Sequence, residues 1–252
     1  MGAARDGMNV LIVIPTYNER ENLPVLAGQI LTQFSYQILV VDDQSPDGTG
    51  AVADELARTY PGRLHVMHRA GKRGLGLSYL DGFKWALATN ADLICQMDAD
   101  LSHDPRYLPD LVSAAAHYDI VLGSRYLHGI SVVNWPLRRI ILSSFANVYV
   151  RSITGLTARD STSGFRCWRR ETLARLPLER ILSQRYAFVV ETLFEVARRG
   201  GRVGEVPIIF IERREGASKM SGRVLAESMV MPWRLVWRNR GRVRPPTGGA
   251  ES

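Results

Sequence analysis

The sequence has little lysine, little cysteine and no long apolar run. Of its 32 Lys and Arg residues, only Lys72, Lys84 and Lys219 are lysines. Arginine suits two-point contacts to phosphate, although a GC-rich genome gives the same bias. Two cysteines, Cys95 and Cys167, are too few for a disulfide framework or a cysteine metal cluster, which leaves a reducing cytosol as the default compartment.

The longest apolar stretches are interrupted by charge, at Arg138-Arg139 and at Glu227 and Arg234. None approaches the roughly 20 uninterrupted apolar residues of a spanning helix, and residues 1–8 lack the apolar core of a secretory signal. We therefore expect any contact with a membrane to be at its surface. The net charge of +7 predicts an anionic partner, which is a nucleic acid, a membrane surface or a phosphorylated ligand.

Short apolar runs rich in β-branched residues alternate with segments of helical spacing. This alternation predicts an open, doubly wound, mostly parallel α/β sheet flanked by helices, whose ligand crevice lies along the carboxyl ends of the strands. The 252 residues have ordinary globular composition, so we expect one domain. The predicted strands are 9–14, 37–41, 64–68, 93–97 and 119–123, and the predicted helices between them are 21–32, 49–60 and 77–88.

Polar residues follow three of these strands at the same predicted edge: Pro15-Thr16-Tyr17, Asp42-Asp43 and Asp98-Ala99-Asp100. Because side chains alternate along a strand, Asp98 and Asp100 should leave on one side and hold a divalent cation between them. Oxygen ligands favour Mg2+ or Mn2+. The alternative is that these two aspartates only cap a helix that begins near Pro105.

The glycine-rich segment 71–76 is not a Walker sequence, because its lysine precedes the second glycine. It is either a flexible turn or a loop that brings Arg69, Lys72 or Arg73 to a ligand phosphate.

The second half of the chain carries two amphipathic segments. A helix over 136–154 has polar positions at Arg138, Arg139, Ser143, Asn147 and Arg151 and apolar ones at Trp135, Ile140, Ile141, Phe145 and Val148. This helix either lies at an anionic bilayer or packs on the core with a solvated basic stripe. A polar loop over 160–166 precedes a helix near Glu171. A helix over 191–199, a strand over 203–210, a cationic loop over 213–219 and a last amphipathic helix from 224 follow.

The domain boundaries follow from this pattern. We expect a flexible N-terminus over 1–8, a single domain over 9–240 and a disordered tail over 241–252. Residues 8–125 would form the catalytic half, and 126–240 the acceptor and lid elements.

Six segments, in order along the chain, resemble the polyprenyl-phosphate (dolichyl-phosphate) mannosyltransferases, inverting family-2 glycosyltransferases of the Rossmann-like GT-A fold. The resemblance covers nearly all of residues 9–220, and its most specific parts are the first two segments and the Arg-x-x-Gly-x-Ser-Lys ending. The segments are 15–23, 41–49, 97–103, 123–126, 162–166 and Phe210 through Lys219.

The resemblance implies roles for particular residues. Asp100 would be the direct metal ligand, with Asp98 beside it. Some relatives carry a metal-binding glutamine where this chain has Ser102, whose shorter hydroxyl would bind the metal directly or through a water. Arg125, Arg139 and Ser143 would bind the acceptor phosphate. The donor residues would be Pro15, Tyr17, Glu19, Val41, Asp42 and Asp43 at the guanosine, Asp98, Ala99 and Asp100 at the ribose-diphosphate, and Arg213 and Lys219 at the diphosphate.

The implied reaction moves mannose from GDP-mannose to a polyprenyl (dolichyl) monophosphate with inversion, using Mg2+ or Mn2+, and supplies polyprenyl-phosphate-mannose for later glycosylation. Asp100 and Arg125 would be its catalytic residues. Many relatives carry transmembrane helices or rely on a membrane-anchoring partner protein. We expect this chain to be cytoplasmic and peripheral on the cytoplasmic face of the membrane, and not to bind nucleic acid.

Three alternatives stay open. A UDP-glucose:polyprenyl-phosphate glucosyltransferase would keep the fold and change the donor. A basic RNA-binding or nucleotide-binding protein would use Arg138, Arg139 and the C-terminal arginines, but leaves the aspartates at three strand ends unexplained. A glycosidase is disfavoured, because Asp98 and Asp100 are too close in sequence to flank a scissile bond easily.

Overall fold

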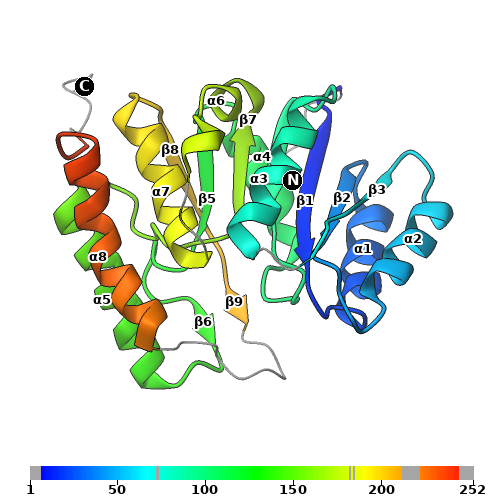
Figure 1. The fold of residues 1–252 in the computed structure, drawn as a ribbon, viewed down its shortest axis with the longest axis horizontal. Helices are drawn as coiled ribbons and strands as arrows, with labels where there is room; N and C mark the ends of the chain where they lie inside the picture. The colour runs from blue at the N-terminus through cyan, green and yellow to red at the C-terminus, as the bar shows by residue number, and fades with distance from the viewer. Residues whose placement is uncertain (1–6, 72–73, 182, 184, 212–221, 244–252) are drawn as a thin grey trace.

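The computed structural model describes residues 7–71, 74–181, 183, 185–211 and 222–243. A seven-stranded sheet in the order β3-β2-β1-β4-β7-β5-β8 runs through this part of the chain (Figure 1). Its neighbours are parallel except at β7, which is antiparallel to both β4 and β5. A smaller sheet pairs β6 with β9. The predicted doubly wound, mostly parallel α/β architecture is confirmed.

Strands and helices alternate through the first half of the chain. The strands are β1 Val10–Thr16, β2 Gln37–Asp42, β3 Leu64–His68, β4 Leu93–Gln96, β5 Ile120–Ser124, β6 Val132–Val133, β7 Arg166–Arg169, β8 Val203–Pro207 and β9 Phe210–Ile211. The helices are α1 Asn22–Gln33, α2 Thr49–Thr59, α3 Leu75–Leu87, α4 Leu108–Ala114, α5 Leu137–Thr154, α6 Arg170–Ala174, α7 Arg185–Arg198 and α8 Gly222–Arg238, with short 3-10 turns at Pro105–Tyr107 and Leu178–Arg180.

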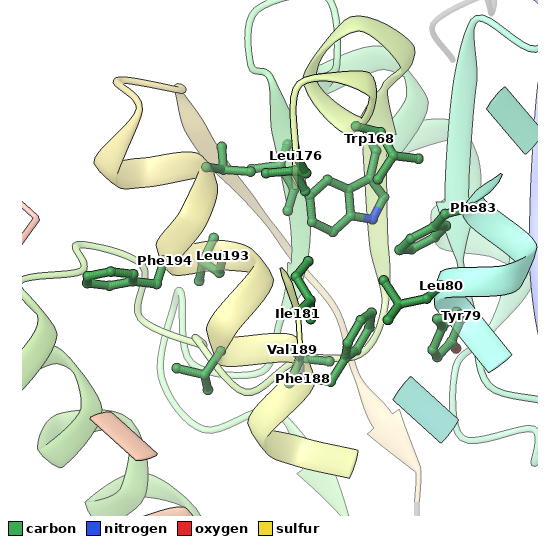
Figure 2. Close-up of a cluster of buried hydrophobic side chains, with 14 of the residues drawn as sticks. Tyr79, Leu80, Phe83, Trp168, Leu176, Ile181, Phe188, Val189, Leu193 and Phe194 are labelled. Carbon is green, nitrogen blue, oxygen red and sulfur yellow. The ribbon is translucent and has the colours of Figure 1, made fainter. Parts of the chain in front are cut away.

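Helices cover both faces of the sheet, which is why its central strands read as continuous apolar runs. Every residue of β1 is buried, as expected for a parallel strand between two helical layers. Side chains of α3 and α7 pack on one face around Phe83, Trp168 and Phe188 (Figure 2). Side chains of α1 and α4 pack on the other face.

Helix α3 contacts the sheet closely at Gly82. A Cβ built on Gly82 would lie 2.5 Å from Cγ1 of Val13 in β1. Glycine therefore sets the distance between α3 and β1, and with it the positions of the α3 side chains Ser78 and Tyr79.

Helices α5 and α8 lie side by side at one end of the sheet (Figure 1). The Tyr149 hydroxyl donates to the carbonyl of Met229 at 2.7 Å and accepts from Nε1 of Trp233 at 3.0 Å. An ion pair between Arg238 and Glu191 joins α8 to α7 at 2.5 Å. No helix in the described ranges combines the length and the hydropathy that crossing a bilayer requires.

Several sequence expectations differ from the structure. No strand was expected between the polar loop over 160–166 and the helix near Glu171, but residues 166–169 form β7. The strand expected over 203–210 is divided between two sheets. Asn147, expected on the polar side of its helix, is buried, whereas Phe145 and Val148 are exposed. The reason is that α5 turns Asn147 toward Ser143 and Thr162.

The chain ends were expected to be disordered. Within the expected tail, Val243 is described, is buried and donates its N–H to the carbonyl of Thr154 at 2.8 Å. Residues 1–6 and 244–252 lie outside the described part.

Candidate active site

Three loops at the carboxyl ends of β1, β2 and β4 lie next to one another, since these strands are neighbours in the sheet. Each loop contains a non-glycine residue at positive φ: Asn18 at 62°, Gln44 at 55° and Leu101 at 61°. Side chains other than Asn, Asp and Gly rarely adopt this conformation, and such residues cluster at functional sites. Three of the five non-glycine residues at positive φ in the described ranges therefore lie at the predicted crevice edge.

Asp42 ties the first two loops together. Its carboxylate accepts from the Thr16 hydroxyl at 3.0 Å, from the Ser45 hydroxyl at 2.5 Å and from the Ser45 N–H at 3.1 Å. Ser45 in turn accepts from the N–H of Asn18 at 3.1 Å. Asp42 is buried, so its carboxylate fixes the positions of the two loops relative to each other.

Asp43 is held from the side of β3 and α3. Its carboxylate forms an ion pair with Arg69 and accepts from the Ser78 hydroxyl at 2.9 Å. The Nε of Arg69 also donates to Asp81 at 2.9 Å. Arg69 is buried and bonded to two carboxylates, and Lys72 and Arg73 lie outside the described residues. The hypothesis that this segment reaches a ligand phosphate stays untested.

Asp98 and Asp100 lie in a turn beyond the sheet, because β4 ends at Gln96. Strand alternation therefore does not align them, contrary to our expectation. The Tyr79 hydroxyl donates to Oδ1 of Asp98 at 2.7 Å, and the Ser102 hydroxyl donates to Oδ1 of Asp100 at 2.5 Å. Neither aspartate begins the next helical turn; Asp104 does, accepting from the N–H of Arg106 at 3.0 Å.

His103 closes this turn. Its Nδ1 accepts from the N–H of Asp98 at 3.2 Å. Its ring stacks on Phe165 with centroids 5.0 Å apart and meets Phe210 edge-on at 5.7 Å. Only 3% of His103 is exposed. The rings of Phe165 and Phe210 therefore enclose the imidazole of His103.

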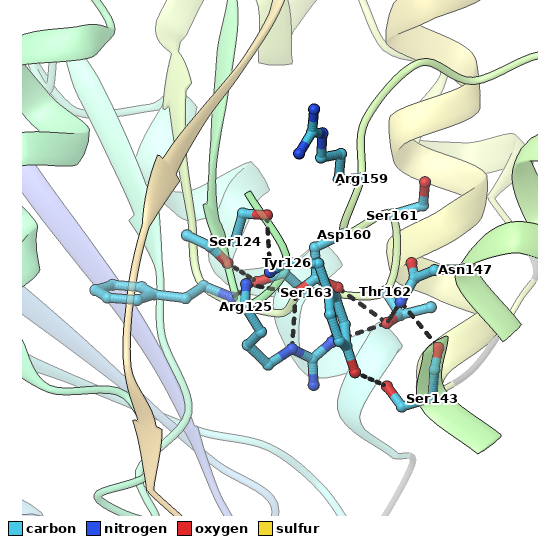
Figure 3. A network of polar contacts seen from close by, with 12 residues as sticks. Ser124, Arg125, Tyr126, Ser143, Asn147, Arg159, Asp160, Ser161, Thr162 and Ser163 are labelled. Atoms are coloured by element: carbon cyan, nitrogen blue, oxygen red, sulfur yellow. Dashed lines mark hydrogen bonds and ion pairs between the residues drawn. The ribbon is translucent and has the colours of Figure 1, made fainter. Parts of the chain in front are cut away.

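A second group of polar contacts lies at the end of β5 (Figure 3). Nε and Nη2 of Arg125 each donate to a carboxylate oxygen of Asp160 at 2.7 Å, and the Arg125 N–H donates to the same carboxylate at 3.0 Å. Nη2 also reaches the Thr162 hydroxyl at 2.9 Å. Burial alone would raise the pKa of Asp160, but the charge and hydrogen bonds of Arg125 outweigh it and lower that pKa.

Aromatic rings surround the Arg125 guanidinium. Its central carbon lies 5.5 Å from the ring centroids of Trp135 and Phe210, and the central carbon of the Arg139 guanidinium lies 4.1 Å from the Trp135 centroid. The Tyr126 hydroxyl donates to the Ser143 hydroxyl at 2.8 Å. The structure thus brings together the three residues predicted to bind the acceptor phosphate: Arg125, directly after β5, and Arg139 and Ser143 of α5.

Arg166 secures the loop that carries Asp160. This fully buried arginine donates to the carbonyls of Ser161, Ser163 and Val189 and to the Thr192 hydroxyl. Burial lowers its pKa to about 9. Its bonds join the 160–163 loop to α7, so the carboxylate of Asp160 has little freedom to move.

The two carboxylates beyond the end of β4 are suited to a divalent cation that is also bound by a phosphorylated substrate. Asp98 and Asp100 could supply carboxylate oxygens, and no group of three or more His, Cys, Asp or Glu suited to a metal occurs in the described ranges. Mg2+ is usually held by one or two carboxylates together with substrate phosphates. Two carboxylates on one short turn match that pattern.

Comparison with known proteins decides the family. The model for "Glycosyl transferase family 2" matches residues 11–176, which include every strand-end loop described above. The chain belongs to this family. The sequence is also 46% identical to "Polyprenol monophosphomannose synthase" of Mycolicibacterium smegmatis, over 95% of this chain and 90% of that protein. It is 46% identical to "Undecaprenyl-phosphate mannosyltransferase" of Micrococcus luteus, over 88% of this chain and 92% of that protein.

Solved structures support the fold of this glycosyltransferase. Glucosyl-3-phosphoglycerate synthase from Mycobacterium tuberculosis, in complex with Mn2+, UDP-glucose and phosphoglyceric acid, has a TM-score of 0.66 and 18% identity, covering 91% of this chain and 81% of that one. The same protein in complex with Mg2+ and UDP has a TM-score of 0.65 and 18% identity, covering 97% and 83%. The predicted glycosyltransferase fold and the predicted resemblance to polyprenyl-phosphate mannosyltransferases are confirmed.

The residues predicted to bind the sugar donor of this glycosyltransferase lie mostly at the ends of β1, β2 and β4 and in the loops that follow them. Pro15 and Val41 are buried partners in the ladder between β1 and β2, and Ala99 is buried beside the two aspartates, whereas Tyr17 and Glu19 are half-buried. Arg213 and Lys219 lie outside the described residues. No site role was predicted for Tyr79, His103, Trp135 or Asp160. Two of them had a signal in the sequence, since His103 ends the 97–103 segment and Asp160 lies two residues before the 162–166 segment.

Proposed function

We propose that this glycosyltransferase transfers mannose from GDP-mannose to a polyprenyl (dolichyl) monophosphate, with inversion at the anomeric carbon. The observation that carries the proposal is the 46% identity to a polyprenol monophosphomannose synthase over 95% of the chain. The geometry supports it, since carboxylates and arginines gather in adjacent regions at one edge of the sheet.

The donor side would use the loops after β1, β2 and β4. Tyr17, Glu19 and the backbone near Pro15 and Val41 would line the guanosine site, and Asp43 would face it from β2. Asp98 and Ala99 would hold the ribose-diphosphate. Arg213 and Lys219 would bind the diphosphate from the segment after β9.

Asp100 and Asp98 would hold Mg2+ or Mn2+, with Ser102 beside them. When bound, such an ion stabilises the negative charge of the departing diphosphate. In the structure the Ser102 hydroxyl and N–H both bond to Oδ1 of Asp100. This supports a role for Ser102 in orienting Asp100, whether or not its oxygen also contacts the ion.

The acceptor side would use Arg125, Arg139 and Ser143. A phosphate oxygen is already anionic at neutral pH, so attack on the sugar requires no general base. The chain must instead bring two anionic substrates together, and two arginines at one region offset their repulsion. Arg125 would do so from a fixed position, because Asp160 and three aromatic rings surround its guanidinium.

A lipid-linked acceptor requires access to a membrane, and the exposed faces of α5 and α8 suit its surface. On α5, Ile141, Phe145 and Val148 are more than half exposed, and α5 contains no Asp or Glu. On α8, Trp233 is 60% and Trp237 is 86% exposed. Apolar and tryptophan side chains next to arginines are typical of peripheral binding to anionic membranes. The enzyme would then work at the cytoplasmic face.

The test is a transfer assay with the purified full chain and a short-chain polyprenyl phosphate. GDP-mannose and UDP-glucose are supplied separately, with Mn2+ or Mg2+ and with EDTA, and sugar in the lipid phase is measured. We expect transfer from GDP-mannose that EDTA abolishes. Transfer from UDP-glucose alone would overturn the donor assignment, and transfer that persists in EDTA would overturn the metal assignment.

A further inference from the structure

Two residues contact Asp98, and they pack on different hydrophobic layers of the molecule: Tyr79 belongs to one layer, and His103 stacks on Phe165 of the other. From the layer of α3 and α7, the Tyr79 hydroxyl donates to Oδ1 of Asp98 at 2.7 Å. Tyr79 is 1% exposed, and its ring stacks on Phe188 with centroids 6.0 Å apart and planes 3° apart (Figure 2). The hydroxyl therefore has no freedom to swing away from the carboxylate.

From the other side, Nδ1 of His103 accepts the N–H of Asp98 at 3.2 Å. A backbone N–H can donate only to an unprotonated ring nitrogen, which assigns the imidazole proton to Nε2. The ring itself is fixed by the stack on Phe165 and the edge contact with Phe210. His103 thus holds the backbone of Asp98 while Tyr79 holds its side chain.

We propose that Tyr79 and His103 are paired positioning residues that fix Asp98 for binding of the divalent cation and the nucleoside diphosphate. The inference rests on the proposed function, because it takes Asp98 to face that ligand. Neither residue is assigned a contact with the reacting atoms; both act through Asp98. Groups that orient a metal-binding carboxylate typically contribute 10-fold to 100-fold to metal affinity.

Tyr79 is suited to this role because its buried hydroxyl donates to Oδ1 of Asp98 at 2.7 Å while its ring is held by the stack on Phe188. Phenylalanine at this position would keep the stacked ring and lose only the donor.

The experiment compares Tyr79→Phe with Tyr36→Phe in the full-length protein. Tyr36 is also buried and stacks on Phe34, but it precedes β2, at the opposite edge of the sheet from the strand-end loops. Binding of Mn2+ in the presence of GDP is followed by electron paramagnetic resonance and by calorimetry. We expect about tenfold weaker Mn2+ binding for Tyr79→Phe and unchanged binding for Tyr36→Phe. An equal loss in both variants, or none in Tyr79→Phe, would overturn the proposal.

A second pair of variants tests His103. In His103→Asn the side-chain oxygen can take the place of Nδ1, whereas in His103→Gln the amide extends toward the position of Nε2 and the Asp98 N–H loses its acceptor. We expect Asn to retain most of the Mn2+ affinity and Gln to lose it. Equal affinities for both would overturn the role of His103. Wild-type protein that binds neither Mn2+ nor GDP would instead defeat the proposed function itself.

Discussion

Arg125 and Asp160 form a buried ion pair in the candidate site. Asp160 is fully buried and the Arg125 side chain is 10% exposed, and two parallel hydrogen bonds of 2.7 Å join them. Such a pair contributes little net stability compared with a well-packed apolar pair, but removing one partner leaves a buried charge without compensation. The pair is therefore sensitive to single substitutions.

We expect Asp160→Asn to lower the free energy of unfolding by about 3 kcal/mol, because Arg125 keeps its charge and loses its counterion. Urea denaturation at pH 7 measures the change. Asp47→Asn is the matched control, since Asp47 also accepts hydrogen bonds, from Thr49 and Arg20, but is only partly buried. A loss no larger than that of the control would contradict the buried ion pair.

The same pair predicts a pH dependence. The folded-state pKa of Asp160 lies below the ordinary value of 3.8, since Arg125 outweighs the effect of burial. Its contribution to stability is therefore complete above the unfolded pKa and is lost as the pH falls through the folded pKa. We expect the stability difference between wild type and Asp160→Asn to be constant from about pH 5 to 8 and to shrink below about pH 4. A constant difference down to pH 2 would contradict this assignment.

Turnover should depend on Arg125 itself. With Arg125→Lys, which keeps the charge but not the paired donors, we expect a large loss of mannose transfer while Mn2+-dependent binding of GDP-mannose persists. Arg159→Ala is the control, because Arg159 lies in the same loop as Asp160 and is exposed. Both variants are assayed for transfer and for donor binding. Near-normal transfer in Arg125→Lys would contradict the proposed role of Arg125 in binding the acceptor phosphate.

At the level of elements, α3 matters most, since it carries Ser78 to Asp43 and Tyr79 to Asp98. Its distance from β1 depends on Gly82. Alanine at this position gains up to about 1 kcal/mol in helix propensity, but its Cβ would lie 2.5 Å from Val13, and overpacking costs about 1–3 kcal/mol. We expect Gly82→Ala to destabilise the protein by about 1 kcal/mol, as measured by thermal denaturation.

The matched control for that substitution is Gly28→Ala. Gly28 lies inside α1, and a Cβ built on it meets nothing within 4 Å. Its backbone is helical, so alanine should raise the melting temperature through helix propensity alone. Opposite signs at the two helical glycines would support the close approach of α3 to β1; a stabilising Gly82→Ala would contradict it.

The first half of the fold was predictable from the sequence because each parallel strand is a short apolar run ended by polar residues. In the second half, β7 reads Arg-Cys-Trp-Arg, with no apolar run to mark it, and it lies in the sheet between β4 and β5. The same register places Cys95 opposite Cys167. Pairing between strands so far apart in the chain is a tertiary effect that local pattern does not contain.

The site was predictable only as far as its charged residues. Aspartates and arginines at strand ends are visible in the sequence, whereas Tyr79 sits inside an apolar helical pattern and His103 in a polar turn. Their roles follow from packing on Phe188 and Phe165, which no spacing rule indicates. The residues that position Asp98 could therefore be identified only from the structure.

For the whole molecule, charge and exposed apolar side chains coincide. The chain carries a net charge of +7, and Arg138 and Arg234 are exposed on the two helices whose apolar faces are uncovered. Apolar insertion and attraction to anionic lipid add in peripheral binding, and only the second is screened by salt. Binding to a membrane surface should therefore have an apolar component that does not depend on salt and an electrostatic component that salt weakens.

We expect the protein to bind vesicles that contain anionic phospholipid and to bind uncharged phosphatidylcholine vesicles much more weakly. Trp233→Ser with Trp237→Ser should weaken binding at every salt concentration, because both indoles are mostly exposed in the structure and would insert into the bilayer. Val25→Ser, which changes an exposed apolar residue on α1, is the control. Vesicle flotation at 50 and 500 mM salt, roughly a threefold change in Debye length, separates the two components. If the double variant binds like wild type while high salt abolishes binding, the attraction is electrostatic alone and the α5–α8 face is not inserted.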